Sequence, residues 1–418
     1  MKFFKEILTL LLTVATATAC DVMKDIHSDS IQTLRYTLRK FSKPRHHITN
    51  PRGKERARKY IRKIFANSGL HVWSEYIDTQ PYLRGENIIG MLRGKHTGTA
   101  DDRIVIVGAH YDTTSRTRGV DDNGSGVTAL LQAAKQIGKS GCRFKNTILF
   151  VAFDFEEDTA ESEHPIPFGS QYFVQNLTEY LSQTGGTVKG AIILEMLANH
   201  NTSKGSQEFP PMFSFISPET YKEVTLDGNR GNFLAVIGRR RTDEIIMKSL
   251  AQHYERDRNF KIQLVPIPLS GRPSQSPYSE NLRDFYRSDH FNFWENSVTF
   301  PAVMVTDTSN FRGDMAKCYH RRCDSMKHID WSDLEFLRRN TDAVIKATLE
   351  LGEKVTGHSN NIRHPIKKTN AGLLTSTKTV DAETKTEDDQ AIVFNSYSQV
   401  VSYTVLTIFL TLINCTFV

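Results

Sequence analysis

Two adjacent motifs decide the fold: Gly108–Thr113 has the sequence GAHYDT, and Gly119–Gly126 has the sequence GVDDNGSG. The first motif follows an apolar run, Ile104–Val107, and places a histidine and an aspartate two residues apart. The second puts two aspartates before a glycine-rich turn that leads into an apolar helical pattern. In open α/β sheets, ligands bind beyond the carboxyl ends of buried strands. The two motifs therefore predict a ligand site at such an end.

Strand and helix patterns alternate on both sides of these motifs. Short apolar runs rich in branched residues predict strands at 87–92, 103–109, 147–153, 188–194 and 300–305. Helical patterns cover 24–70, 127–137, 172–181, 242–254 and 331–351. This alternation predicts an α/β fold, with a mainly parallel mixed sheet and helices on both faces. We place it in a single catalytic domain over 24–352. Long loops at 161–168 and 199–230 are expected to act as lids or specificity elements.

Acidic residues follow the predicted strands, whereas chance would scatter them over both ends of the sheet. Together with two histidines they offer the N and O ligand atoms that suit Zn²⁺. The set suffices for two ions that share one carboxylate, and comprises His110, Asp122, Glu157, Glu195 and His320.

Two further acids have supporting roles in this interpretation. Asp112 can orient the imidazole of His110 from outside the ligand set. Glu156 and Glu157 are neighbours on an extended chain end, so their side chains point in opposite directions and one can bind metal while the other faces water.

The chain resembles the M28 family of co-catalytic zinc peptidases. The resemblance rests on six motifs in family order, over roughly residues 39–352: GAHYDT, VDDNGSG, FDFEED, AIILEM, SDHFNF and CYHRRCD. It implies the fold of the zinc exopeptidases, which is phosphorylase/hydrolase-like, with two Zn²⁺ per chain and a peptide substrate.

The resemblance also implies a role for each site residue. His110 and Glu195 hold one zinc, and Glu157 and His320 hold the other. Asp122 bridges both ions, with a strained or cis peptide link to Asn123. Glu156 is the general base, and Asp112 resembles the family's acid that lies behind the metal ligands and supports His110. In the SDH motif, Asp289 and His290 lie on the substrate side, and His290 stabilises the oxyanion.

Two departures from the family pattern bear on specificity. Glu195 stands where many members have aspartate, and residues 158–167 form a longer and more acidic link than usual. Some members have lost catalysis together with their ligands, whereas the key positions all remain here.

The N-terminal signal described below predicts an oxidising compartment, in which disulfides persist. Cys318 and Cys323 flank His320 and are expected to form a disulfide, with a zinc-binding run as the alternative. Cys142 has no partner in the mature domain and is expected to be a buried free thiol.

Both ends of the chain predict a secreted or cell-surface protein. Residues 1–19 are typical of a signal peptide, with a lipoprotein signal as the weaker alternative. Residues 356–399 are polar and predict a disordered stalk. The apolar tail at 400–418 predicts a GPI-anchor signal, with a retained membrane helix as the alternative. Asn176 and Asn201 head N-glycosylation triplets.

Charge gives little further direction. The net charge is +6, and much of the excess lies in 35–63. This segment predicts a solvated helix face, or else a site for an anionic surface or glycan. The sequence contains no nucleic-acid-binding module, so we expect no nucleic-acid partner. Oligomeric state is not predicted.

We therefore expect a surface or secreted di-zinc exopeptidase, most simply an aminopeptidase. The alternatives are a related carboxypeptidase or dipeptidase, a glutaminyl cyclase-like enzyme, and a non-catalytic receptor-like ectodomain. The intact Glu156–Glu157 pair argues against the cyclase.

Overall fold

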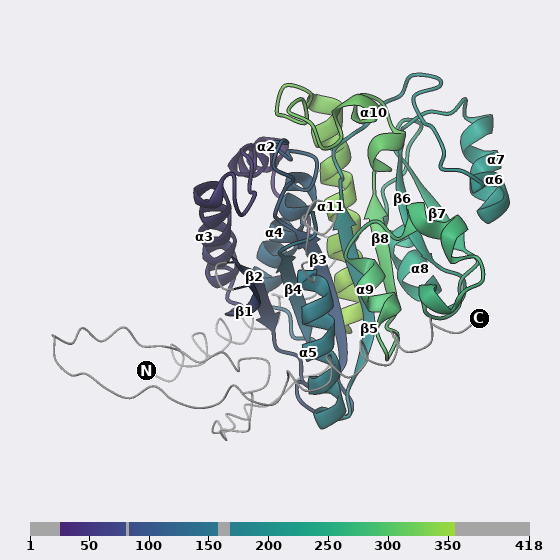
Figure 1. Ribbon diagram of the computed structural model, residues 1–418. Coiled ribbons are helices and arrows are strands. Elements are labelled where there is room, and N and C mark those ends of the chain that lie inside the picture. Colours follow the sequence, from purple (N-terminus) through teal and green to yellow (C-terminus); the bar gives the residue numbers. More distant parts are fainter. Residues whose placement is uncertain (1–25, 81–82, 158–167, 356–418) are drawn as a thin grey trace, which may run out of the picture. The chain divides into compact units, whose positions relative to one another are not determined.

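The computed structural model describes residues 26–80, 83–157 and 168–355, and these fall in one compact unit (Figure 1). The strands are β1 (His71–Gln80), β2 (Leu83–Leu92), β3 (Arg103–His110), β4 (Ile148–Phe153), β5 (Thr187–Glu195), β6 (Phe233–Arg239), β7 (Lys261–Ile267) and β8 (Ala302–Thr306). The helices are α2 (Ile31–Lys40), α3 (Pro51–Asn67), α4 (Gly124–Lys139), α5 (Gly169–Thr184), α6 (Phe213–Ile216), α7 (Pro218–Leu226), α8 (Glu244–His253), α9 (His290–Glu295), α10 (Met315–Cys318) and α11 (Trp331–Gly352). Short 3-10 turns are η2 (Pro273–Gln275), η3 (Ser279–Phe285) and η4 (Ser309–Phe311).

The strands form one sheet in the order β1-β2-β4-β3-β5-β8-β6-β7. Its centre, β4-β3-β5-β8, is parallel throughout. Antiparallel pairs join β2 to β4 and β6 to β8, so both outer parts add antiparallel neighbours. The predicted mixed, mainly parallel sheet is confirmed.

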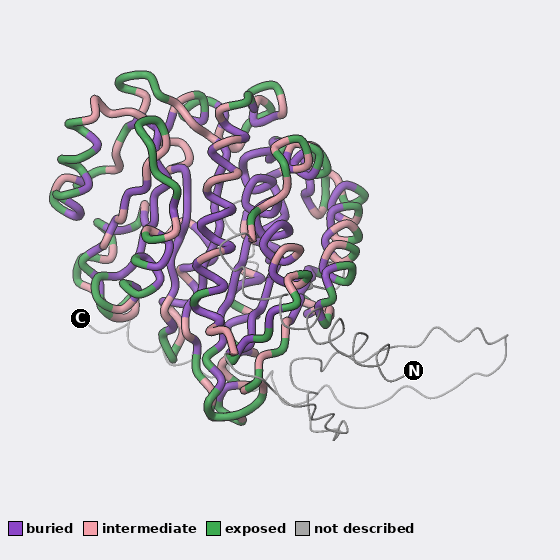
Figure 2. The backbone as a smooth tube through the Cα atoms, turned by 180° about the vertical axis from the view of Figure 1, so that it is seen from behind, coloured by how far each residue is buried: buried purple, intermediate pink, exposed green. Residues whose placement is uncertain are grey.

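Helices cover both faces of the sheet because alternate strand residues point to opposite sides. Val105 and Val107 of β3 pack into a core with α3, α4, α8 and α11. Ile104 and Ile106 of the same strand pack into a second core with α5 and α9. Figure 2 shows the central strands buried along almost their whole length. Strands that are apolar on both faces are typical of such a two-sided layer.

Three strands escaped the sequence prediction. Strand β1 is an edge strand whose apolar residues come only as two pairs, Val72–Trp73 and Tyr76–Ile77, so it has neither an apolar run nor a strict alternation. The other edge strand, β7, contains Pro266, which edge strands tolerate because one row of N–H groups has no partner strand. The apolar run of β6 ends in three consecutive arginines, so the sequence does not predict a buried strand there.

Two segment predictions also need correction. The helical stretch predicted over 24–70 is two helices, α2 and α3, separated by residues 41–50. A new helix starts at Pro51 because Asn50 accepts the Gly53 N–H as its N-cap and Pro51 suits the first helical position. The loop predicted at 199–230 contains α6 and α7.

The glycine-rich motif sets the position of α4 against β5. Asn123 caps α4 by accepting the Gly126 N–H at 3.1 Å, and its Nδ2 donates to the Leu194 carbonyl at 2.7 Å. A Cβ at Gly126 would lie 2.2 Å from Asn123 Oδ1 and 2.8 Å from the Leu194 oxygen. Only glycine therefore allows this close approach, which brings the motif to the end of β5.

Most cations of the basic segment at 35–63 are exposed, as the predicted solvated face requires, but two of them point inward to a buried carboxylate. Lys54 Nζ lies 2.5 Å from Asp154 Oδ1, and Arg58 Nη2 lies 2.8 Å from Asp154 Oδ2. Burial alone would raise the pKa of Asp154, but these two cations hold it below its usual value. A buried carboxylate after β4 thus explains why α3 is basic on its inner side.

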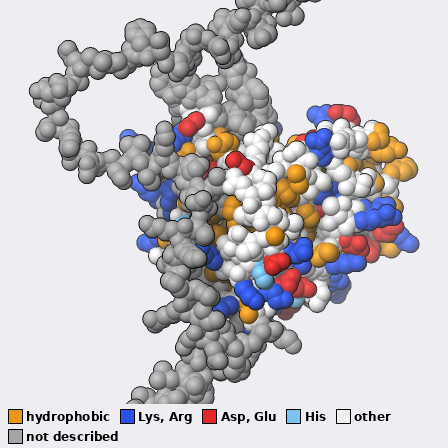
Figure 3. Space-filling view, turned by 90° about the horizontal axis from the view of Figure 1, so that it is seen from below, with side chains coloured by type: hydrophobic (Ala, Val, Ile, Leu, Met, Phe, Trp, Pro, Cys, Tyr) orange, Lys and Arg blue, Asp and Glu red, His pale blue; other side chains and the backbone are white. Residues whose placement is uncertain are grey.

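On the face seen in Figure 3, basic and acidic side chains lie interspersed, with hydrophobic side chains between them. Within the described ranges, no helix has the length and apolar character needed to cross a bilayer. The predicted signal peptide (1–19), stalk (356–399) and tail (400–418) lie outside the described residues, as does most of the predicted loop 161–168.

Candidate metal centre

The predicted ligands meet at the carboxyl ends of the central parallel strands. His110 is the last residue of β3, Glu195 is the last residue of β5, and Glu157 follows β4. Asp122 precedes α4, and His320 follows α10. Sequence positions up to 210 residues apart are brought together here, as the alternating pattern of the sheet predicts.

The donors form two groups, each with ligand atoms within 4.8 Å of one another: His110, Glu156 and Glu195 in one, and Asp122, Glu157 and His320 in the other. Asp122 faces both groups. Its Oδ1 lies 3.6 Å from His110 Nε2, and its Oδ2 lies 3.3 Å from His320 Nε2. This placement fits a carboxylate shared between two cations. The Asp122–Asn123 peptide bond is cis.

Unpartnered buried atoms supply a test of whether the groups fit metal ions. Among the described residues, Asp122 Oδ2, Glu157 Oε1 and His320 Nε2 are buried atoms without a hydrogen-bond partner. Native proteins rarely leave such atoms unsatisfied, and a cation is one of the accepted reasons. Imidazole nitrogen with carboxylate oxygen is also the donor set that zinc takes in catalytic sites. The residues present therefore fit two zinc ions.

The electrostatics of the site favour cations. Burial opposes protonation of His110, but the carboxylates of Glu195 and Glu156 outweigh it and hold its pKa well above the usual value. Burial likewise opposes protonation of His320, yet Asp122 and Glu157 raise its pKa to about 11. Burial and the charge of Asp122 raise the pKa of Glu157 to about 8. The site thus concentrates negative charge in a buried place, which a divalent ion would neutralise.

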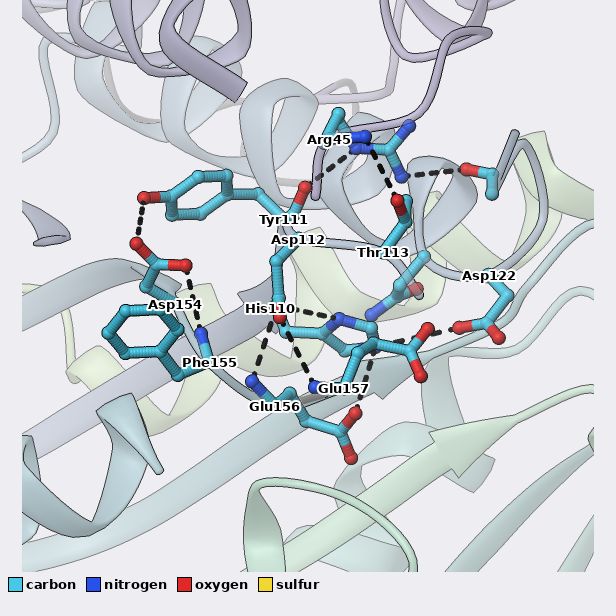
Figure 4. A network of polar contacts seen from close by, with 12 residues as sticks. Arg45, His110, Tyr111, Asp112, Thr113, Asp122, Asp154, Phe155, Glu156 and Glu157 are labelled. Carbon is cyan, nitrogen blue, oxygen red and sulfur yellow. Dashed lines mark hydrogen bonds and ion pairs between the residues drawn. The ribbon is translucent and has the colours of Figure 1, made fainter. Parts of the chain in front are cut away.

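Glu156 and Glu157 differ in exposure. The Glu157 side chain is 3% exposed and approaches His320 Nε2 at 3.0 Å. The Glu156 side chain is 14% exposed, and its Oε2 lies 3.9 Å from His110 Nε2, the longest of the carboxylate–imidazole distances at the site. Figure 4 shows the two side chains leaving the backbone in different directions. The division between Glu157 as a metal ligand and Glu156 as a free carboxylate stays a prediction, because Glu156 also lies in the first donor group.

Left-handed backbone conformations cluster at the ligands. Phe155 (φ 56°), Met196 (φ 53°) and His320 (φ 57°) each adopt a positive φ that non-glycine residues rarely take. The first two are direct sequence neighbours of Glu156 and Glu195. Strain of this kind persists where surrounding contacts impose it, and it gathers at functional sites.

Asp112 organises both glutamates as well as His110. Its two carboxylate oxygens accept the backbone N–H groups of Glu156 at 3.3 Å and Glu157 at 3.2 Å (Figure 4). Its Oδ1 also lies 3.4 Å from His110 Nδ1. One carboxylate therefore fixes the imidazole of one metal group and the backbone of the residue that serves the other.

We expect Asp112→Asn to lower metal affinity by about 10- to 100-fold, as changes behind metal ligands typically do. Asparagine keeps only one acceptor oxygen, so its NH₂ group would face one of the two backbone N–H donors. Chelator competition measures the change. The matched control is Asp102→Asn at the opposite end of β3, where a buried aspartate accepts the Thr147 N–H at 2.9 Å and hydroxyl at 2.6 Å. Equal metal affinity in the two variants would contradict the assigned role.

Several residues that support the site were not predicted. Arg45 Nε donates to the Tyr111 carbonyl at 2.6 Å and its Nη2 to the Gly119 carbonyl at 2.7 Å, which ties the two opening motifs together (Figure 4). Asp324 accepts the Asp122 N–H at 3.1 Å. Ser288 donates to Glu195 Oε2 at 2.7 Å. Ser288 stands in the SDHFNF motif and Asp324 in the CYHRRCD motif, so the motifs were the sequence signal that could have identified them.

The SDH motif contains one correction. His290 is fully buried, its Nε2 lies 2.8 Å from the Phe285 carbonyl oxygen, and its ring packs edge-on against Trp294. Burial lowers its pKa to about 4. His290 therefore belongs to neither donor group, and because its Nε2 is engaged by the Phe285 carbonyl, the structure does not support that atom as an oxyanion donor. Asp289 is also buried, and burial raises its pKa to about 7 while the charge of His110 opposes that rise.

The cysteine and glycosylation predictions have mixed outcomes. Cys318 and Cys323 form the predicted disulfide around His320. Cys142 is disulfide-bonded too, so the predicted free thiol was wrong. Asn176 sits within α5 and donates its Nδ2, the atom that would carry a glycan, to buried Glu75 at 2.6 Å, which argues against modification there. Asn201, in an irregular segment after β5, stays a prediction.

Comparison with known proteins tests the resemblance. The model of peptidase family M28 matches residues 87–225 and 236–347. The uncharacterized protein YfbL of Escherichia coli is 30% identical over 298 residues, which cover 67% of this chain and 76% of YfbL. Aminopeptidase Y of Saccharomyces cerevisiae is 23% identical over 65% of this chain and 41% of its own length, so the chain spans less than half of that relative. The LapA aminopeptidase of Legionella pneumophila shares the fold, with a TM-score of 0.53 at 16% identity over 82% of this chain and 76% of LapA.

The family model spans the segments that hold all the donors, from His110 to His320. YfbL matches at the level of sequence over three quarters of its length. Together with the two donor groups, these matches confirm the predicted resemblance, the metallopeptidase class and the zinc cofactor. The chain belongs to peptidase family M28.

Proposed function

We propose that this chain is an aminopeptidase that removes N-terminal residues from peptides at a site with two zinc ions. The observation that carries the proposal is the arrangement of the acids: Asp122 faces two donor groups, and Glu156, in the first group, is more exposed than Glu157. The name of the yeast relative, Aminopeptidase Y, supports cleavage of the N-terminal peptide bond.

The chain's own residues have separate tasks in this reaction. His110 with Glu195, and His320 with Glu157, would hold the two ions, with Asp122 between them. When bound, the ions supply Lewis-acid activation of water and of the peptide carbonyl. Glu156 is placed to accept a proton from the attacking water and to return it to the leaving amine. Asp112 holds the backbone that carries Glu156.

Peptides with a free or a blocked α-amine provide the test. We expect leucyl-4-nitroanilide to be hydrolysed about 10- to 100-fold faster than its N-acetyl form, because acetylation removes charge-assisted hydrogen bonds to the ammonium group. The rates are measured with purified zinc-loaded protein. N-acetyl-leucyl-alanine and the N-blocked nitroanilide serve as matched controls.

The other outcomes identify the alternatives. Cleavage of N-acetyl-leucyl-alanine, which keeps a free C-terminal carboxylate, without cleavage of either nitroanilide would indicate a carboxypeptidase. Release of ammonia from an N-terminal glutamine without peptide cleavage would indicate a glutaminyl cyclase-like enzyme. If the protein holds two zinc ions but turns over none of these substrates, the result would support the non-catalytic, receptor-like ectodomain.

We further propose that the protein is secreted or held at the cell surface. The Cys318–Cys323 disulfide and the bonded state of Cys142 support an oxidising compartment. Release of the full chain from cells by phosphatidylinositol-specific phospholipase C would support the anchor predicted from residues 400–418. Retention of the protein on cells after that treatment would favour a membrane helix. Glycosidase digestion tests whether Asn201 carries a glycan.

A further inference from the structure

A cationic face covers the side of α2 and α3 that is turned away from the core. The segment at 35–63 carries twelve lysines and arginines and a single acid, Glu55, whereas the whole chain has a net charge of only +6. The rest of the chain is therefore net acidic, and the excess positive charge is concentrated in this segment. The cationic face consists of the exposed members of the twelve: Arg39, Lys40, Lys43, Arg52, Arg56, Lys59 and Lys63.

Four of these cations form a line along α3, here called the cationic line. Its members follow one another at steps of four, three and four residues, which keeps them on one side of the helix: Arg52, Arg56, Lys59 and Lys63. Ile61, near the middle of the buried side, points the opposite way. At a rise of 1.5 Å per residue the line spans about 16 Å, with a cation roughly every 5 to 6 Å.

Helix α2 extends the cationic face beside α3 (Figure 1). The ring of Phe41, at the end of α2, contacts the ring of Tyr60 in α3, with centroids 6.0 Å apart. Lys40 and, to a smaller extent, Lys63 of α3 lower the pKa of Tyr36. Cations of both helices therefore surround one point of the surface, and the face is continuous from α2 to α3.

Most of the cationic face has no acidic partner. Within residues 26–80, 83–157 and 168–355, Lys59 is the only member with a carboxylate oxygen within 4.0 Å, that of Glu55 at 3.7 Å. The cations that α3 turns inward are paired instead with Asp154 and Glu86. The positive charge of the face is therefore left for an anion from outside the chain.

The cationic line opposes the stability of its own helix. Its members are i,i+3 or i,i+4 neighbours, and like charges at these spacings destabilise a helix. Arg52 also stands in a first turn that contains no acid, where the helix dipole disfavours a cation. Helix α8 shows the usual alternative, since its exposed Lys248 pairs with Glu244 at 2.6 Å. The line therefore points to an external partner that supplies the negative charge.

The form of the face favours a linear polyanion over a bilayer. An interfacial helix inserts its apolar side into a bilayer, but the apolar side of α3 is already in the core, where Ile61 and Phe65 are fully buried. The exposed apolar side chains of the segment, Tyr36 and Ile48, are too few to replace it.

Single-stranded nucleic acids also fit the face poorly. They stack their bases on exposed aromatic rings, whereas the Tyr36 ring carries the Lys40 ammonium 4.2 Å from its centroid. The face offers charge at regular spacing instead, partly from guanidinium groups that bind paired anionic oxygens.

We propose that the cationic face binds linear sulfated polysaccharides, with the polysaccharide lying along α3 and its sulfate groups on the cationic line. This is the glycan alternative that the sequence leaves open for the segment at 35–63. The proposal goes beyond peptide cleavage, because the face shares no residue with either donor group. Neutralised cations and sulfates release counterions, so the affinity must fall as the salt concentration rises.

The test compares two variants that remove four positive charges each. In the line variant the cationic line is changed to glutamine: Arg52→Gln, Arg56→Gln, Lys59→Gln and Lys63→Gln. The control variant changes four exposed arginines beside β6 and β7, at the other end of the sheet from β1: Arg240→Gln, Arg241→Gln, Arg256→Gln and Arg258→Gln. Calorimetry measures binding of heparin oligosaccharides to the purified, zinc-loaded protein between about 50 and 200 mM salt.

We expect the plot of log affinity against log salt to lose about three to four from its slope in the line variant, and less than about one in the control variant. At about 150 mM salt the line variant should bind heparin about 10-fold or more weakly than the unchanged protein. Equal losses in the two variants would overturn the proposal, because heparin would then respond to net charge alone.

Other polyanions test the choice of partner. Heparosan, which carries carboxylates but no sulfates, should bind about 10-fold or more weakly than heparin, since fewer cations are neutralised. Equal binding of the two would reject the sulfated polysaccharide. Tighter binding to phosphatidylserine vesicles, or to double-stranded DNA, than to heparin at the same salt concentration would also overturn it.

Thermal melting separates a binding role of the line from a structural one. The line variant should melt about 1 to 3 °C above the unchanged protein, because it removes repulsion between like charges along α3. Its zinc content should be unchanged, which shows that the fold is intact. A lower melting temperature together with lost heparin binding would mean that the line stabilises the fold, and would overturn the assignment.

Discussion

Glu156→Gln should keep both zinc ions and lose about 10²- to 10⁴-fold in kcat, the usual contribution of a general base. Glutamine has the same shape but cannot accept the proton. The backbone that carries residue 156 is held by Asp112, which the substitution leaves in place. Zinc content by atomic absorption and steady-state kinetics on one preparation give the two readouts.

The neighbouring acid provides the matched control. Glu157→Gln changes a side chain that is 3% exposed and lies 3.0 Å from His320 Nε2. It should lose the zinc of the second group as well as activity, because an uncharged amide is a poor replacement for a buried carboxylate ligand. Loss of zinc in Glu156→Gln, with zinc retained in Glu157→Gln, would mean that the two glutamates have the opposite roles. The comparison is needed because Glu156 lies in one donor group with His110 and Glu195, where it could also bind metal.

The location of the site could be predicted because its determinants are local. His110 and Glu195 each end a buried apolar strand, and Glu157 follows another, so three positions follow from strand patterns alone. In a parallel sheet, consecutive strands joined by helices bring such ends to one edge. The glycine-rich turn after Asp122 likewise marks the start of a helix. None of these inferences needs knowledge of long-range packing.

The tasks of single residues within a motif could not be predicted. Ser288, Asp289 and His290 are consecutive, yet only the first contacts a metal-ligand candidate through a hydrogen bond, and the last is packed against Trp294. Which of three neighbours faces a site depends on how α9 docks on the sheet. Arg45 is a similar case, since a single arginine in a basic segment gives no sign that it will bind two carbonyls at positions 111 and 119.

The outer strands β6 and β7 could not be predicted from the sequence for a related reason. Strands β6 and β7 flank α8 and pair in parallel with each other, but β6 joins the central sheet antiparallel, so the order of elements does not predict where this pair attaches. The side chains of Phe233, Ala235 and Ile237 point to one face of the sheet. That face is fixed only by the register of β6 with β8. A shift of one residue would turn those side chains into the opposite core.

Asp122→Ala should remove both zinc ions and lower kcat/KM by about 10³-fold or more, because Lewis-acid activation is worth several kcal/mol and each 1.4 kcal/mol is about tenfold in rate. Alanine deletes the carboxylate that lies 3.6 Å from His110 Nε2 and 3.3 Å from His320 Nε2. Zinc content should fall from two to below one per chain. The rise in melting temperature on zinc addition should also disappear, since that rise comes from binding to the folded state.

Two comparison variants separate a shared ligand from an ordinary one. Asp121→Asn changes the preceding acid, whose Oδ1 accepts the Ala198 N–H at 3.0 Å, a role that an amide oxygen can keep; it should retain both ions. Glu195→Ala removes a ligand that belongs only to the His110 group, so it should retain about one zinc, held by Glu157, His320 and Asp122. If Asp122→Ala also retains one zinc, Asp122 serves the His320 group alone. The two ions would then bind independently, and the measured stoichiometry distinguishes that arrangement from a bridged pair without reference to activity.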